Sequence, residues 1–327
     1  MISLNEEEAK IFLAKNNIIN YVIKKVAGDA SFRSYYRVLF DEKTFILMFA
    51  PPSHEDIIPF IKIDEFLVKN NFSAPKIFAI DEAAGFILLE DFGDDSYGKI
   101  LGSKFANDEL VEESLYKNAC NVLIELHKIS GPQGLENYNH ALLFREVMLF
   151  VDWYLPHVKK TTLSLQEKSY FKYLWFELFD LLSREKQVLV LRDYHADNLM
   201  LLKNIEGYKS VGLLDFQDAV IGCAAYDLVS LLEDARRDVS PKTREEIFTH
   251  YLGSSSINKN SFAQDYEILS LQRNIKIAGI FARLAVRDSK PQYLNLLPRV
   301  INLIKMRLTT NSPILADIAA FLQKFIY

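Results

Sequence analysis

The chain has 327 residues, and half of them are hydrophobic, so it can bury a sizeable core in one large domain or two smaller ones. It carries 38 Lys and Arg residues against 43 Asp and Glu residues, a net charge of −5 without a basic block, which argues against nucleic acid as a partner. An acidic start and short, interrupted apolar runs argue against an export signal and a membrane-spanning segment. We therefore expect a cytoplasmic protein without a membrane partner.

The first part of the chain has mainly strand patterns. We predict a helix at residues 6–17, strands at 18–26, 35–40 and 44–49, a helix at 57–70, and strands at 76–80 and 85–90. A polar, glycine-containing break follows the last of these strands. We therefore place a domain boundary near residue 91, with a β-rich, nucleotide-binding lobe at residues 1–91.

The second part, residues 92–327, is mainly helical and is predicted to be the catalytic and substrate-binding lobe. Helical patterns occupy residues 107–129, 141–155, 164–184, 226–237, 241–252, 262–287, 292–308 and 313–325. Short apolar strands are expected at 188–191, 199–202 and 211–214. The chain is therefore predicted to be an α+β protein with a small β-rich lobe and a larger helical lobe.

Two polar clusters, each placed after a short apolar strand, carry the candidate chemistry. Asn198 follows Asp193 by five residues, and Asp215 ends the next strand. Phosphoryl transfer from ATP needs a carboxylate that orients the attacking hydroxyl and accepts its proton, and oxygen ligands that hold Mg²⁺. We therefore predict Asp193 as the catalytic base and Asn198 and Asp215 as Mg²⁺ ligands. Two surface turns, in which Asp and Asn side chains bond their own backbone, are the alternative.

A family resemblance makes this prediction narrower. The loop from Asp193 to Asn198, with His195 two residues after the aspartate, resembles the catalytic loop of the aminoglycoside phosphotransferase-like superfamily. Further segments resemble bacterial anomeric kinases of N-acetylmuramate and N-acetylglucosamine: 28–33, 50–52, 143–146, 149–154, 215–219, 226–228, 234–239 and 271–273. The resemblance covers nearly the whole chain and implies a two-lobed, protein-kinase-like fold.

The resemblance implies an ATP-dependent kinase that phosphorylates the C1 hydroxyl of one or both amino sugars in cell-wall recycling. We expect the substrate to contact His195, Arg145, Glu146, Asp152 and Trp153, although an interface helix with a buried tryptophan would have the same pattern. Alternatives are a kinase of another hydroxylated compound, such as an aminoglycoside, and a silent binding protein. The preferred sugar and the oligomeric state stay open.

The sequence departs from the usual kinase pattern at one position expected to contact the nucleotide. Met48 occupies the strand position at which kinases usually keep a phosphate-pairing lysine. Arg37, one strand earlier, or Arg33 in the loop before it could supply a cation, and we favour Arg37. An outward-facing arginine on an exposed strand is the alternative for Arg37. Together with Arg37, the predicted nucleotide-binding residues are Gly28, Ser31 and Glu90.

Two further features have mainly structural interpretations. Asp227 lies near a helix start, where a carboxylate commonly caps free amides. Late in the chain, Arg273, Lys276, Arg283 and Arg287 fall on one side of a predicted helix. Such a stripe is either a solvated basic face or a site for a carboxylate.

Overall fold

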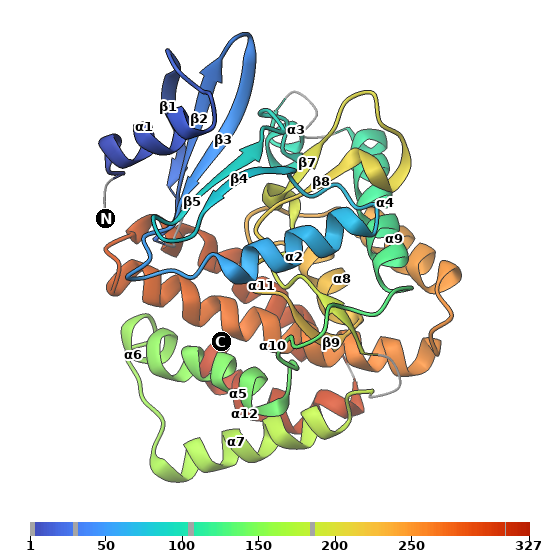
Figure 1. Cartoon of the computed structure of the whole chain (residues 1–327). Helices are drawn as coiled ribbons and strands as arrows, with labels where there is room; N and C mark the ends of the chain where they lie inside the picture. Colours follow the sequence, from blue (N-terminus) through green and yellow to red (C-terminus); the bar gives the residue numbers. More distant parts are fainter. Residues whose placement is uncertain (1–3, 29–31, 104–107, 184–186, 311) are drawn as a thin grey trace. The chain divides into compact units, whose positions relative to one another are not determined.

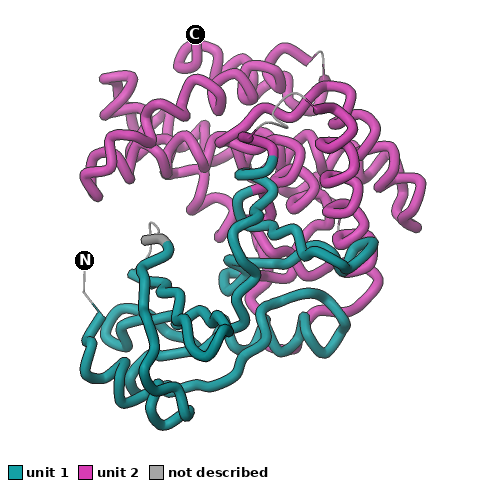
Figure 2. The backbone as a smooth tube through the Cα atoms, turned by 90° about the horizontal axis from the view of Figure 1, so that it is seen from above, with its two compact units in different colours: residues 1–100, 197–218 teal, residues 101–196, 219–327 magenta. Residues whose placement is uncertain are grey.

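The computed structural model of the chain describes residues 4–28, 32–103, 108–183, 187–310 and 312–327 (Figure 1). Two compact units are present: Met1–Ile100 with Asp197–Asp218, and Leu101–Ala196 with Ala219–Tyr327 (Figure 2). The chain therefore returns to the first unit after entering the second, which the sequence did not indicate. The functional boundary near residue 91 stays a prediction.

A five-stranded antiparallel sheet forms the centre of the first unit. Its strands, in spatial order, are β1 (Val22–Gly28), β2 (Ser34–Phe40), β3 (Lys43–Phe49), β5 (Phe86–Glu90) and β4 (Ile77–Asp81). The predicted strand at 18–26 begins only at Val22, because Asn17 and Asn20 have left-handed backbone φ angles of 62° and 58°. The two faces of this sheet have different roles because side chains alternate along each strand.

One face of the sheet packs against helix α1 (Glu6–Lys15). Phe12 and Leu13 of α1 share a core cluster with Val38, Leu47 and Phe86, among other residues. Met48 follows Leu47 directly and therefore points to the opposite face, where it is fully buried. The missing strand lysine is thus replaced by a core side chain.

The returning segment joins the first unit as a hairpin. Strands β7 (Leu199–Leu201) and β8 (Val211–Leu213) pair antiparallel, and the amide of Leu213 donates to the carbonyl of Ser73 at 2.8 Å. Phe216, just after β8, stacks on Phe60 of helix α2 (Ile58–Lys69), with 5.1 Å between ring centroids. These contacts fix the segment that carries Asn198 and Asp215 within this unit.

The second unit is mainly helical. Its helices include α4 (Glu109–Leu126), α5 (His140–Leu149), α6 (Leu155–His157), α7 (Leu165–Asp180), α8 (Ala225–Leu232), α9 (Pro241–Ser254), α10 (Lys259–Val286), α11 (Leu297–Thr309) and α12 (Ala316–Ile326). Strand β6 (Gln187–Val190) pairs antiparallel with β9 (Val220–Cys223), which the sequence analysis did not predict. The antiparallel sheet of the first unit and the helices of the second confirm the predicted α+β fold class.

Several predicted helices differ from the structure. The one expected at 292–308 begins as a 3₁₀ helix, Pro291–Leu296, before α11. The helix expected at 226–237 ends at Leu232, because Glu233 leaves helical backbone geometry with φ −119° and ψ 56°. The helix expected at 141–155 is α5 followed by a π-helical turn, Phe150–Tyr154. Gly279 of α10 approaches the start of this turn so closely that an added Cβ would lie 2.2 Å from the carbonyl carbon of Leu149.

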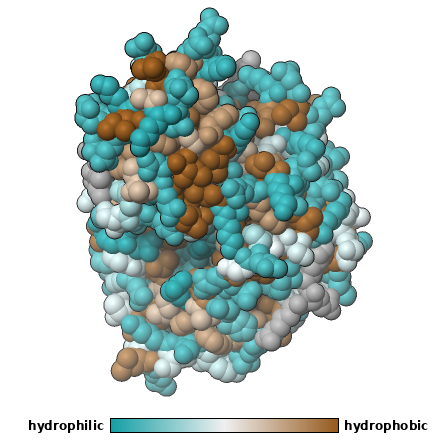
Figure 3. Space-filling model, viewed as in Figure 1, coloured by the Kyte–Doolittle hydropathy of each residue, from teal (hydrophilic) through white to brown (hydrophobic). Residues whose placement is uncertain are grey.

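The surface in Figure 3 is mostly hydrophilic, with hydrophobic atoms in separate patches on the face shown. Within the described ranges, no helix combines the length and the apolar character that crossing a bilayer requires.

Candidate active site

Asn198 and Asp215 come together in the first unit. Nδ2 of Asn198 donates to Oδ2 of Asp215 at 3.3 Å, and the amide of Leu214 donates to the carbonyl of Asn198 at 3.0 Å. Gln217 adds a second amide contact, from Nε2 to Oδ1 of Asp215, at 2.8 Å. Asp215 has a left-handed φ of 59°, a conformation that costs free energy for a residue with a Cβ and that occurs often at functional sites.

This pair has the donor chemistry of a magnesium site. A carboxylate and a side-chain amide oxygen are hard ligands, which suit Mg²⁺ better than they suit zinc. The two residues therefore fit the predicted metal site by ligand type and by proximity.

Asp193 lies in the second unit, on a loop held by a buried carboxylate. Asp227 of α8 accepts the amide of Leu191 at Oδ2, at 2.6 Å, and the amide of Arg192 at Oδ1, at 2.9 Å. The hydroxyl of Ser230 donates to the carbonyl of Arg192 at 3.2 Å. These bonds stabilise Arg192 in a left-handed conformation, with φ 70°, immediately before Asp193.

The contacts of Asp227 correct its predicted role. Residue 224 precedes α8 without a side-chain cap, and Asp227 binds the loop before Asp193 rather than the first amides of its own helix. Burial raises the pKa of Asp227 to about 7, and its two amide hydrogen bonds act in the opposite direction. The residue is therefore a support of the candidate catalytic loop.

Positive charges surround Asp193. Burial alone would raise the pKa of its carboxyl, but the nearby positive groups outweigh this effect and hold the pKa below its ordinary value. Lys276 contributes most among them, ahead of Arg273 and Arg192. Asp193 is consequently ionised at neutral pH and can accept a hydrogen bond from a substrate hydroxyl.

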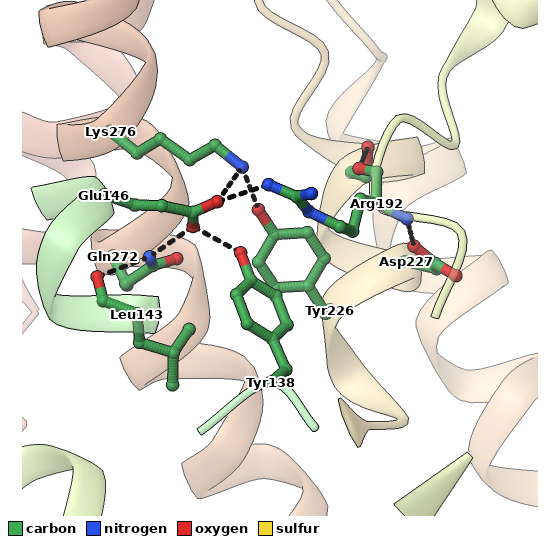
Figure 4. Close-up of polar contacts among 9 residues, drawn as sticks. Tyr138, Leu143, Glu146, Arg192, Tyr226, Asp227, Gln272 and Lys276 are labelled. Carbon is green, nitrogen blue, oxygen red and sulfur yellow. Dashed lines mark hydrogen bonds and ion pairs between the residues drawn. The ribbon is translucent and has the colours of Figure 1, made fainter. Parts of the chain in front are cut away.

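A polar cluster of the second unit centres on Glu146 (Figure 4). Its carboxylate accepts Nη2 of Arg192 at 2.5 Å and Nζ of Lys276 at 2.9 Å. Gln272 donates to it at 3.1 Å, and the hydroxyl of Tyr138 donates as well. Burial would raise the pKa of Glu146, but these partners lower it to about 2.

This arrangement changes the expected role of Glu146. The side chain is 6% exposed and its oxygens are occupied by protein donors, so it favours a positioning role over direct contact with a sugar. Its ion pair with Arg192, the residue before Asp193, joins α5 to the candidate catalytic loop. The network combines side chains from distant parts of the sequence, which the residue pattern could not reveal.

The other predicted substrate residues have different environments. His195 is 4% exposed, and its Nε2 accepts Nη1 of Arg236 at 3.0 Å; burial, with the Arg236 charge, lowers the pKa of His195 to about 3. Arg145 and Asp152 are exposed, and Trp153 stacks on His157 with 5.5 Å between centroids. Their contacts with a substrate stay predictions.

Among the predicted nucleotide residues, Arg37 is held by acidic side chains. Its Nε and Nη2 bind Asp91 at 2.6 and 3.0 Å, and its Nη1 binds Asp94 at 3.0 Å. Register with β3 places Arg37 opposite Ile46 and hence on the Met48 face of the sheet. The guanidinium therefore lies on the same sheet face as Met48, but acidic side chains of the first unit already bind it.

The remaining nucleotide residues stay predictions. Gly28 is the last residue of β1 and pairs with Ser34, whereas Ser31 lies outside the described residues. Glu90 ends β5 and accepts the amide of Lys76 at 3.1 Å. These positions leave the nucleotide contacts to be tested by experiment.

The sequence analysis missed a buried acid on α2. Asp64 is 2% exposed, and its Oδ2 has no hydrogen-bond partner among the described residues. Burial, followed by the charges of Glu65 and Glu90, raises its pKa to about 7. The only available signal was its place on the inward face of an amphipathic helix.

The fold and these clusters define a phosphotransferase of the protein-kinase-like class. Residues 22–266 match the phosphotransferase enzyme family, and the chain belongs to that family. It is 31% identical to the N-acetylmuramate/N-acetylglucosamine kinase of Caulobacter vibrioides, over 99% of this chain and 98% of the relative. It is 33% identical to the enzyme of the same name from Pseudomonas aeruginosa, over 90% of this chain and 86% of that one.

Solved structures support the fold. The ADP-bound aminoglycoside phosphotransferase APH(2'')-Ib is similar with a TM-score of 0.60, at 13% identity, over 93% of this chain and 99% of that one. The ethanolamine kinase of Plasmodium vivax has a TM-score of 0.62, at 14% identity, over 94% and 93% of the two chains. At these identities the likeness concerns the fold alone.

Proposed function

We propose that the protein is an ATP-dependent kinase of N-acetylmuramate and N-acetylglucosamine that phosphorylates the C1 hydroxyl and acts in cytoplasmic recycling of cell-wall sugars. The observation that carries this proposal is the fixed loop before Asp193, whose backbone binds Asp227 and whose Arg192 binds Glu146. Similarity to kinases of these two sugars over nearly the whole chain supports the choice of substrate.

Each polar group then has a role in phosphoryl transfer. Asp193 accepts a hydrogen bond from the attacking hydroxyl, orients it, and takes its proton as the bond to phosphorus forms. Asn198 and Asp215 would hold Mg²⁺, which neutralises phosphate charge when bound. Gly28, Ser31 and Glu90 are proposed to contact the nucleotide, and Arg145, Asp152 and Trp153 the sugar, with a flat aromatic face suited to a pyranose ring.

The supporting groups keep Asp193 ionised and in place. The cations around it keep it ionised, so that a proton need not leave it before the substrate binds. Arg192 and Glu146 limit the movement of the loop, because their ion pair is nearly buried. Orientation of a hydroxyl by a fixed carboxylate is a large part of catalysis in enzymes of this class.

An acceptor panel tests the proposal. The purified protein is incubated with ATP, Mg²⁺ and either amino sugar, or with kanamycin, and ADP release is measured. We expect turnover with both sugars and none with kanamycin. Asp193→Asn should lower kcat by about 10²- to 10⁴-fold, the range usual for loss of a general base. Turnover of kanamycin alone, or full activity of Asp193→Asn, would contradict the proposal.

A further inference from the structure

Helices α5 and α10 run side by side in the same direction. Gln272 of α10 donates to the carbonyl of Leu143 at 3.3 Å, and one turn later Lys276 binds Glu146 at 2.9 Å. Residue numbers therefore rise in the same direction along α5 and α10 where the two helices touch (Figure 4). This parallel register predicts which residues meet beyond the region drawn there.

The next contact extends the register into the π-helical turn. Gly279 lies against the backbone of Phe150, where an added Cβ would be 2.5 Å from the Phe150 nitrogen. One further turn places Arg283 beside the segment that contains Asp152 and Trp153. The helix face that supports Asp193 thus continues to the segment proposed to contact the sugar.

Arg283 differs from the other cations of this face in its charge environment. Lys276 is bound to Glu146, and Arg287 holds both oxygens of Asp288, at 2.7 and 2.9 Å. The Nε of Arg283 is buried and has no hydrogen-bond partner within the part of the chain that the structure describes. Burial, with the charge of Arg287, also lowers the pKa of Arg283, and the charge of Asp288 offsets part of this effect. Such a site stabilises an added anion.

The spacing along α10 matches a sugar that reacts at Asp193. Arg283 follows Lys276 by two turns, about 10 Å along the axis and about 20° around it. Among the groups around Asp193, Lys276 contributes most to lowering the pKa of its carboxyl. A side chain on a helix leans toward the helix N-terminus, so the guanidinium extends back toward Lys276. A single hexose with one substituent can therefore reach from Asp193 to the Arg283 guanidinium.

We infer that Arg283 binds the carboxylate of the lactyl group of N-acetylmuramate and thereby admits the acidic sugar. This inference rests on the proposed function and adds to it the group that distinguishes the two substrates, because N-acetylglucosamine lacks this carboxylate. A guanidinium binds a carboxylate through two parallel hydrogen bonds, which a lysine cannot reproduce. Arg273 and Lys276 of the predicted basic stripe belong to the buried surroundings of Asp193 instead.

Initial-rate kinetics on both sugars test this inference. Arg283→Gln should lower kcat/KM for N-acetylmuramate by about 10- to 100-fold, the usual effect of losing a charge-assisted pair, and change that for N-acetylglucosamine by less than about twofold. Arg283→Lys should recover part of the loss. Arg287→Gln is the matched control, one turn later and exposed, and should leave both sugars unaffected. The methyl ester of N-acetylmuramate should be as poor a substrate for the wild type as the acid is for Arg283→Gln.

Several results would overturn the inference. Equal losses of kcat/KM for both sugars in Arg283→Gln would show a general structural effect. An unchanged kcat/KM for N-acetylmuramate would show that the lactyl carboxylate binds elsewhere. A rise in the KM for ATP of Arg283→Gln at saturating N-acetylglucosamine would show that Arg283 binds a phosphate of ATP. A wild-type protein that phosphorylates neither sugar would instead contradict the proposed function itself.

Discussion

The Arg192 guanidinium and the Glu146 carboxylate form a nearly buried ion pair, with 2.5 Å between Nη2 and Oε1. Arg192 directly precedes Asp193, and Glu146 lies on α5, close to the residues proposed to contact the sugar. Geometry at Asp193, the proposed catalytic base, is therefore coupled to the helix that leads to the proposed sugar contacts.

The first prediction concerns this pair. Glu146→Gln leaves Arg192 and Lys276 buried without their shared carboxylate, so we expect the free energy of unfolding to fall by about 3–5 kcal/mol. Adding Lys276→Met removes one of the two excess charges and should restore part of the loss. Chemical denaturation of the three proteins measures both effects. Identical stability of wild type and Glu146→Gln would show that the pair does not support the loop.

A second prediction concerns Asp227. Its two oxygens accept two backbone amides, whereas Asn offers one acceptor and one amino group that would oppose an N–H donor. Asp227→Asn should therefore destabilise the protein by about 1–3 kcal/mol and lower kcat while the KM for ATP stays constant. Steady-state kinetics with a thermal melt separate these effects. An unchanged kcat in a destabilised variant would limit Asp227 to a folding role.

Arg37 gives a third prediction. Because Asp91 and Asp94 occupy its guanidinium, we expect Arg37→Ala to leave the KM for ATP within about twofold. It should cost about 1–3 kcal/mol of stability, because the buried Asp91 carboxylate loses its cation and keeps the amide of Gly93 as a donor. Asp94→Asn removes only the exposed partner and should cost less than about 1 kcal/mol. If Arg37→Ala instead raised the KM for ATP about tenfold without loss of stability, the arginine would bind phosphate as the sequence first suggested.

The fourth prediction uses the buried acid Asp64. Its folded-state pKa of about 7 lies above the ordinary value of 3.8, so the unfolded chain releases this proton first and the folded state loses stability as pH rises through this interval. Asp64→Asn resembles the protonated form and should gain about 1–3 kcal/mol over wild type between pH 5 and pH 8. Urea denaturation at both pH values checks the sign. A gain that is the same at both pH values would show that Asp64 does not titrate there.

Several features were predictable from local patterns. The strands near the start have β-rich stretches bounded by turn residues, and the spacing of Asp193, Asn198 and Asp215 indicated phosphoryl transfer before any contact was known. Residue type and spacing suffice there because the chemistry requires particular side chains at particular strand ends. The short hairpin between Asn198 and Asp215 brings these two predicted metal ligands into contact.

Other features depend on contacts between distant segments, which a single sequence does not contain. Glu146 was expected to bind substrate, yet its partners come from α10 and from the loop before Asp193. The role of Asp227 was missed for the same reason. The π-helical turn begins where Gly279 of α10 approaches the backbone closely, and no pattern within α5 reveals that contact.

The position of the transferred phosphate decides whether the enzyme acts on the anomeric hydroxyl. The protein is incubated with ATP, Mg²⁺ and N-acetylglucosamine, or with the methyl glycoside of that sugar, and products are analysed by phosphorus NMR. We expect a phosphate on C1 of the free sugar and no product from the glycoside, which keeps every other hydroxyl. A phosphate on another carbon, or robust turnover of the glycoside, would contradict anomeric phosphorylation.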